Sequence, residues 1–207
     1  MKLIKYLMIA FLAVSFCQKA NAQRLKKATE KQKRQMIATI NQTSTKIHTI
    51  QCDFTQVSEL SFLEDKATAK GRMSFTAPGS LVWQYTSPTH YTFSIDKGKV
   101  TTKSGGKTHS IDISNNKMYQ NIVEMMMNSV SGKSLGNGRN FAVEMYVSGS
   151  EWIAWLTPLK PDFRKMFKSV RLHFNQQERR VQQVEMISNN GDNIKITLSN
   201  IQTTYRR

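Results

Sequence analysis

Apolar residues along most of the chain recur at every second position, a pattern typical of β-strands with one buried and one solvent-facing side. The alternation begins after Gln51, where Cys52 and Phe54 alternate with polar residues. Ten further segments repeat it: Met73–Phe75, Leu81–Tyr85, Tyr91–Ile95, Val100–Lys103, Thr108–Ile113, Phe141–Val147, Trp152–Leu156, Val170–Phe174, Val181–Ile187 and Ile194–Ile201. Hairpin turn chemistry at Asp96–Lys99 and at Asn190–Asp192 separates neighbouring strands. We therefore predict an α+β, mainly β fold with about eleven strands in one antiparallel sheet.

Two segments have helical rather than alternating periodicity. Residues 23–50 place Met36, Ile37 and Ile40 at helical spacing among basic and amide side chains. Residues 117–131 contain Ile122 and the run Met125–Met127. A long sheet curls, and its concave apolar face needs a cover. We expect these two helices to lie across it, either as a lid over a cavity, for which flexible methionines are suited, or as a permanent plug of the core.

The N-terminus has the features of an export signal. Lys2 and Lys5 precede an apolar run, Tyr6–Cys17, that is too short to cross a bilayer, and Ala20-Asn21-Ala22 matches the small-x-small cleavage pattern. The alternative is acylation of Cys17, which is disfavoured by the bulky residue before it. We predict a signal peptide over residues 1–22, cleavage before Gln23, and a single exported domain over residues 23–207.

The chain is strongly basic, with a formal net charge of +16 at pH 7. Residues 1–22 hold three lysines and no acid, so their removal lowers this charge to +13. Such an excess favours encounters with anionic partners, which outside the cytoplasm include phosphate-bearing lipid headgroups, acidic membrane-protein surfaces and lipopolysaccharide. A basic surface that only keeps the protein soluble is the alternative.

No constellation in the sequence suits catalysis or metal binding. The four histidines are dispersed, and Cys52 is the single cysteine left after cleavage, which excludes an intramolecular disulfide. Gly105-Gly106-Lys107-Thr108 lacks the earlier glycine of a phosphate-binding loop, because Thr101 stands there. We expect a binding protein that is not an enzyme and has no metal or cofactor. Export argues against nucleic acid as a partner.

A series of short motifs along the chain resembles the LolA family, the periplasmic carriers of outer-membrane lipoproteins. The motifs occur in this order: Phe54-Thr55-Gln56, Gly71–Phe75, Pro78 followed by Leu81–Tyr85, Ser87-Pro88, Asp96–Lys99, Leu156-Thr157-Pro158 and Gly191-Asp192. The resemblance covers most of the chain after the signal peptide, and its specificity lies in the order of the motifs.

The resemblance implies an open half-barrel of antiparallel strands capped by helices. It also implies a monomeric periplasmic chaperone that accepts lipoprotein acyl chains from an inner-membrane transporter, delivers them to an outer-membrane acceptor, and touches membrane surfaces transiently. The alternative is a carrier or sensor of another lipid, such as a glycolipid or a pigment.

For lipid contact we select large apolar side chains on the expected concave face and on the lid. They are Trp83, Tyr85, Phe93, Met125 and Met126, with Phe54, Phe75 and Ile122 as further lining. The alternative for Phe54, Phe75 and Phe93 is a purely structural place in the core. The family's better-studied members carry an arginine that helps to hold the lid closed, where this chain has Ala77 before Pro78. Arg72 and Lys70 are the candidates to replace it.

Overall fold

The computed structural model describes residues 25–62, 64–113, 120, 128, 135 and 140–206. The predicted signal peptide therefore lies outside the described residues. So does most of the predicted methionine-bearing helix, including Ile122, Met125 and Met126.

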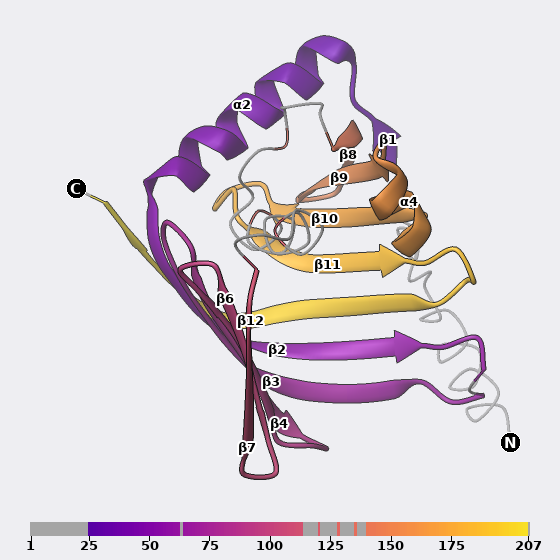
Figure 1. Cartoon of the computed structure of the whole chain (residues 1–207). Helices are drawn as coiled ribbons and strands as arrows, with labels where there is room; N and C mark the ends of the chain where they lie inside the picture. Colours follow the sequence, from indigo (N-terminus) through magenta and orange to yellow (C-terminus); the bar gives the residue numbers. More distant parts are fainter. Residues whose placement is uncertain are drawn as a thin grey trace, which may run out of the picture.

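The described elements are mostly strands (Figure 1). The strands are β1 (Lys26–Lys27), β2 (Ile47–Glu59), β3 (Ala67–Thr76), β4 (Ser80–Ser87), β5 (Tyr91–Asp96), β6 (Lys99–Ser104), β7 (Lys107–Asp112), β8 (Phe141–Ser148), β9 (Glu151–Pro158), β10 (Ser169–Asn175), β11 (Val181–Ile187) and β12 (Asn193–Tyr205). The helices are α2 (Glu30–Lys46) and α4 (Pro161–Met166).

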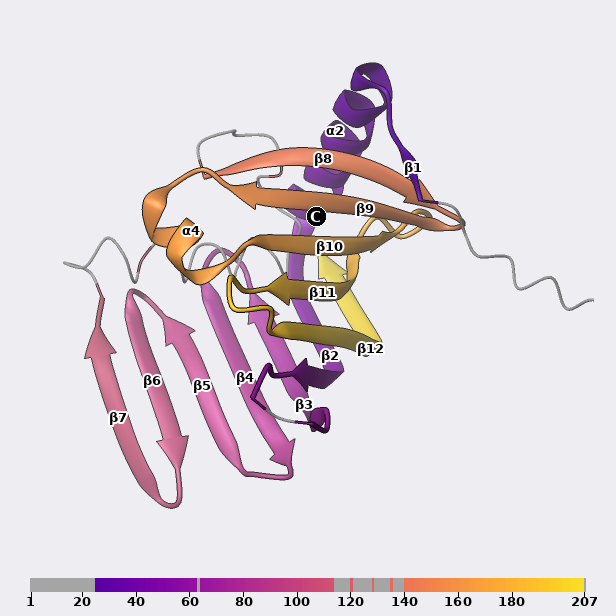
Figure 2. The same ribbon diagram turned by 90° about the vertical axis from the view of Figure 1, so that its right-hand side faces the viewer.

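All twelve described strands belong to one antiparallel sheet in the order β1-β8-β9-β10-β11-β12-β2-β3-β4-β5-β6-β7. Figure 2 shows the sheet curling, with β8 to β11 folded over β2 and β3. The edge strands β1 and β7 do not pair with each other, so the sheet stays open. The mainly β, open antiparallel architecture is confirmed. The count of eleven strands was one too low, because β1 consists of two exposed lysines that carry no alternation signal.

The helix α2 is shorter than predicted. Thr29 caps its start, accepting a hydrogen bond from the Gln32 amide while the Gln32 side chain returns to the Thr29 amide. The prediction that the helix continues to Ile50 was wrong, because the chain enters β2 at Ile47. Ile47, Thr49 and Ile50 are β-branched, which favours an extended backbone, and they pair with the C-terminal residues of β12.

The strand register divides the sheet into an inner apolar face and an outer polar face. Cys52, Met73, Trp83 and Phe93 occupy neighbouring positions on β2, β3, β4 and β5. The next inner row consists of Ile50, Phe75, Leu81 and Ile95. The other half of the sheet continues the inner face with Ile196, Val184, Leu172, Ala154 and Met145. These residues form one buried cluster with Met36 and Ile40 of α2.

One glycine marks the closest packing on the inner face. Gly71 lies between Phe54 on β2 and Tyr85 on β4 in the sheet register. A Cβ atom at Gly71 would overlap the Gln84 carbonyl oxygen and the Phe54 ring. The missing side chain therefore lets Phe54 lie flat over β3 and reach the aromatic rings of β4.

We expect the substitution Gly71→Ala to lower the free energy of unfolding by about 3 kcal/mol or more, because a backbone oxygen cannot move aside without disturbing the β3–β4 ladder. Urea unfolding followed by circular dichroism measures this. Gly79→Ala is the matched control, since a Cβ there meets nothing within 4 Å. Equal unfolding midpoints for the two variants would contradict the packing described for Gly71.

Candidate functional site

An aromatic cluster occupies the inner face where β2, β4 and β5 approach one another. The Phe54 ring lies 4.4 Å from the Trp83 ring, centroid to centroid, and meets Tyr85 edge-on at 5.2 Å. Tyr91 extends the cluster at 6.1 Å from Tyr85. Such contacts add to the stabilisation that comes from burying the rings.

A hollow opens on the inner face beside this cluster, with a volume of about 280 Å³. Its lining comes from β2, β3, β4, β5 and the β4–β5 turn: Gln56, Ser58, Ala67, Thr68, Ala69, Tyr85, Pro88, Thr89 and Tyr91. We call it the inner hollow. Small residues on β3 create the space, and two tyrosine rings form its wall. The volume is close to the lower end of about 300–1,000 Å³ that is typical of small-molecule sites.

Several polar side chains border the inner hollow, among them Tyr85 and Gln56. The Tyr85 hydroxyl donates a hydrogen bond of 2.9 Å to the Gln56 side-chain oxygen. Burial raises the pKa of Tyr85, and the neighbouring Trp83 N–H acts against this to a smaller extent. The inner hollow therefore combines tyrosine rings and alanine side chains with hydrogen-bonding groups at its border.

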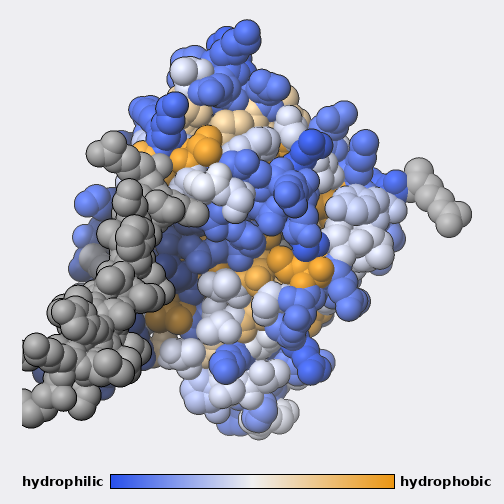
Figure 3. All heavy atoms as spheres, turned by 180° about the vertical axis from the view of Figure 1, so that it is seen from behind, coloured by the Kyte–Doolittle hydropathy of each residue, from blue (hydrophilic) through white to orange (hydrophobic). Residues whose placement is uncertain are grey.

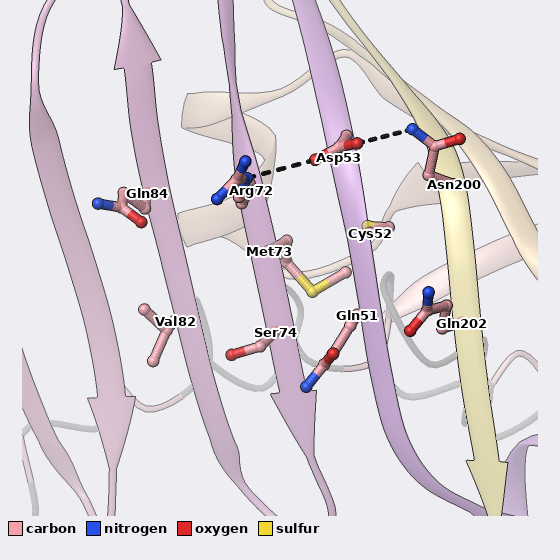
Figure 4. A pocket seen from close by; sticks show the side chains of 10 residues that line it. All are labelled: Gln51, Cys52, Asp53, Arg72, Met73, Ser74, Val82, Gln84, Asn200 and Gln202. Atoms are coloured by element: carbon pink, nitrogen blue, oxygen red, sulfur yellow. Dashed lines mark hydrogen bonds and ion pairs between the residues drawn. The ribbon is translucent and has the colours of Figure 1, made fainter.

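A second hollow of about 320 Å³ lies on the outer face of the same strands (Figure 4). Two rows of side chains cross β4, β3, β2 and β12 there: Gln84, Arg72, Asp53 and Asn200, then Val82, Ser74, Gln51 and Gln202. Asp53 accepts a hydrogen bond of 2.7 Å from Asn200 and lies 3.7 Å from the Arg72 Nε. Hydrocarbon would desolvate these charged and amide groups without replacing their hydrogen bonds, which is costly. The inner hollow is thus the better candidate for a lipid.

One face of the exterior is mostly polar. Seen from behind, most of the described surface is hydrophilic and its hydrophobic areas are small and separate (Figure 3). In the described part of the chain, no helix is long and apolar enough to cross a membrane. No group of three or more potential metal ligands occurs among the described residues either.

The structure brings together five of the eight residues selected from the sequence. Phe54, Phe75 and Trp83 are buried in the core, with exposed fractions of 1%, 5% and 8%. Tyr85 and Phe93 are half-buried and pack against the same core. The other three, Ile122, Met125 and Met126, lie outside the described residues, so lipid contact of the whole set stays a prediction.

Sequence reasoning missed the small and polar part of the lining. Ala67, Ala69, Gln56 and Ser58 border the inner hollow, yet a search for large apolar side chains does not select them. Tyr91 is part of the same alternating pattern as Phe93, so it could have been selected from the sequence. The others become visible only through the register, which places Gln56 opposite Ala69 and Ser58 opposite Ala67.

Neither proposed substitute for the family arginine points to the inner face. Arg72 pairs in register with Asp53 and Gln84 on the outer face, and Lys70 pairs with Thr55, which alternates with the inner residue Phe54. Ala77 itself packs against the core, and its amide donates to the His48 carbonyl at 2.8 Å. Arg72 and Lys70 are therefore wrongly placed to lock a lid over the inner hollow.

Cys52 tests the close packing of the inner face. Burial raises the pKa of its thiol to about 12; the Asp53 carboxylate adds to this effect and Arg180 opposes it. In the chain that begins at Gln23, Cys52 is the single cysteine. At a pH of about 8.5, where an ordinary thiol is half ionised, we expect the folded protein to react with a thiol reagent roughly a thousandfold more slowly than the urea-unfolded protein. Similar rates in the two states would show that the row of Cys52, Met73 and Trp83 is open to water.

The chain is similar to several known proteins and matches one family model. No curated protein sequence matches the chain. Among solved structures, it is similar to the LolA superfamily protein NE2245 from Nitrosomonas europaea, with 9% identity, coverage of 83% of this chain and 94% of that chain, and a TM-score of 0.40. LprF from Mycobacterium bovis is 13% identical, with coverage of 86% of this chain and 97% of that chain and a TM-score of 0.44. The lipoprotein LppX from Mycobacterium tuberculosis is 9% identical, with coverage of 84% of this chain and 96% of that chain and a TM-score of 0.44. The model of the family described as outer membrane lipoprotein carrier protein LolA matches residues 45–206. Because this match spans most of the chain, the protein belongs to the LolA family.

Proposed function

We propose that the protein is a periplasmic carrier that binds the acyl chains of lipoproteins on the inner face of its sheet and shuttles them from the inner to the outer membrane. The observation that carries the proposal is an apolar inner face with an aromatic cluster beside an open hollow, in a chain of the LolA family. The partners would be an inner-membrane lipoprotein-releasing transporter and an outer-membrane acceptor.

The size of the inner hollow implies movement during loading. A volume of about 280 Å³ is small for several acyl chains, and Phe54, Phe75 and Trp83 are already packed by the protein's own side chains. Hydrocarbon would enter by widening the hollow along the aromatic cluster. The segments that would move are α2, which contributes Met36 and Ile40 to the core, and the predicted helix with Met125 and Met126.

The energetics suit a carrier that must also release its cargo. Burying one methylene contributes about 0.8 kcal/mol, so a chain of roughly fifteen methylenes would gain roughly 12 kcal/mol in a preformed cavity. Separating side chains that are packed in the core costs free energy, because their own apolar contacts are lost. The packed inner face would therefore offset part of the binding energy, and a partner that favours the open form could then load or unload the protein.

Cargo identity is tested by purifying the protein from the periplasm and analysing the bound material by mass spectrometry. We expect a triacylated protein fragment or an intact lipoprotein. A free glycolipid or pigment in its place would contradict lipoprotein transport and support a carrier of another lipid, an alternative consistent with Ala77 at the position of the family arginine. Protein that is consistently empty, yet docks a membrane receptor, would indicate a sensor.

The location of the cargo is tested by filling each hollow separately. Ala69→Phe places a ring in the inner hollow, and Ser74→Phe places one in the outer hollow on the same strand. We expect the first variant to lose most acyl-chain binding, measured with a fluorescent fatty acyl ligand, and the second to keep it, with both retaining the native circular dichroism spectrum. The opposite result would move the lipid site to the outer face.

A further inference from the structure

Three large apolar side chains are exposed at one end of the sheet. Phe62, in the turn between β2 and β3, is 75% exposed. Leu159, two residues before α4, and Met166, the last residue of α4, are 46% and 37% exposed. Isolated apolar side chains on a surface are common. These three differ because hydrogen bonds connect the segments that carry them.

Hydrogen bonds from the turn between β11 and β12 connect the two segments. The Asn189 side chain donates to the Arg164 and Lys165 carbonyl oxygens of α4, at 2.6 and 3.2 Å. Asp192 accepts a bond of 2.7 Å from the Ser61 amide, next to Phe62. Figure 2 looks onto this end, where α4 and both turns are visible. We call the surface formed by residues 60–62, 159–168 and 188–192 the α4 end.

A buried aromatic contact fixes the position of α4. Phe163 is 1% exposed and stacks on Phe141 with ring centroids 5.3 Å apart. Because this residue anchors the short helix, turning α4 to bury Met166 would break the stack of Phe163 on Phe141.

Basic residues surround the apolar side chains of α4. Lys160, Arg164, Lys165 and Lys168 lie within ten residues, against the single acid Asp162. Near Phe62 the balance differs: Glu59 pairs with Lys66 at 2.6 Å, and Glu64 and Asp65 add negative charge. Attraction to an anionic surface would thus come from α4, while Phe62 would contribute only its apolar ring.

The combination of exposed apolar side chains with flanking cations is that of an interfacial membrane contact. Basic side chains are drawn to anionic headgroups, and apolar ones enter the boundary with the acyl chains. The β2–β3 hairpin that carries Phe62 also supplies Ser58 and Ala67 to the inner hollow. A bilayer on the α4 end would therefore lie close to the point where hydrocarbon leaves or enters.

We propose that the protein docks on anionic bilayers through the α4 end, with Leu159, Met166 and Phe62 at the interface. The inference rests on the proposed lipid-carrier function, which it extends by naming the surface and its partner.

Co-sedimentation of the full chain after Gln23 with vesicles tests the electrostatic part. We expect binding to vesicles of phosphatidylethanolamine with phosphatidylglycerol, weak binding to phosphatidylcholine alone, and a loss of binding as salt is added. Arg164→Gln with Lys165→Gln should weaken binding to the anionic vesicles by about fivefold per charge. Lys103→Gln with Lys107→Gln, on the distant β6–β7 hairpin, removes the same charge and should leave most of the binding intact.

The apolar part has its own matched control. Leu159→Ser with Met166→Ser should weaken binding to the anionic vesicles, whereas Ile111→Ser, at a residue that is 56% exposed on the edge strand β7, should not. Equal losses from the control variants, or no binding of the unmodified protein to anionic vesicles, would overturn the proposal. Acyl-ligand binding by the same variants in solution should be unchanged, so failure of docking is distinguishable from failure of the carrier function.

Discussion

An open sheet with one apolar face imposes the main physical constraint on this molecule. The twelve strands of the described residues pair continuously from β1 to β7, yet the two edge strands do not pair with each other. In a closed barrel the strands themselves would enclose the inner side chains. Here one half of the sheet folds over the other (Figure 2), and Met36 and Ile40 of α2 join the same core. The contacts of α2 with this core are made by side chains and belong to no strand ladder.

Alternate residues of β2 to β4 point to opposite faces of the sheet, one towards the core and the other towards the outer hollow. Even-numbered residues of β2, such as Cys52 and Phe54, face the core, and odd-numbered residues, such as Gln51 and Asp53, face the outer hollow. A slip of one residue would exchange the two sets, so the register that builds the core also defines the site. The bulge in β12 between Ser199 and Gln202 accommodates Asn200 with a φ of 51° and directs its amide to Asp53.

Much of this fold could be predicted from the pattern of side chains. The strand Val181–Ile187 was located to the residue, and the predictions for β9, β10 and β12 differ from the structure only at their ends. The errors have physical causes. β1 has no apolar residue to reveal it, and α2 ends early because strand pairing with β12 prevails over helical spacing at Ile47 and Ile50. Of the residues that line the inner hollow, the sequence analysis selected Tyr85, but Ala69 and Ser58 depend on cross-strand register, which a single sequence does not display.

If the protein carries lipid as we propose, hydrocarbon enters along the inner face of the sheet. Isotope-filtered nuclear Overhauser spectroscopy of the protein loaded with a fatty acyl ligand tests this directly, because it detects ligand protons close to particular side chains. The account predicts contacts from acyl methylenes to the rings of Tyr85 and Tyr91 and to the Ala69 methyl group, which border the inner hollow. Contacts to the Val82 methyl groups on the outer face, with none to these three residues, would contradict it.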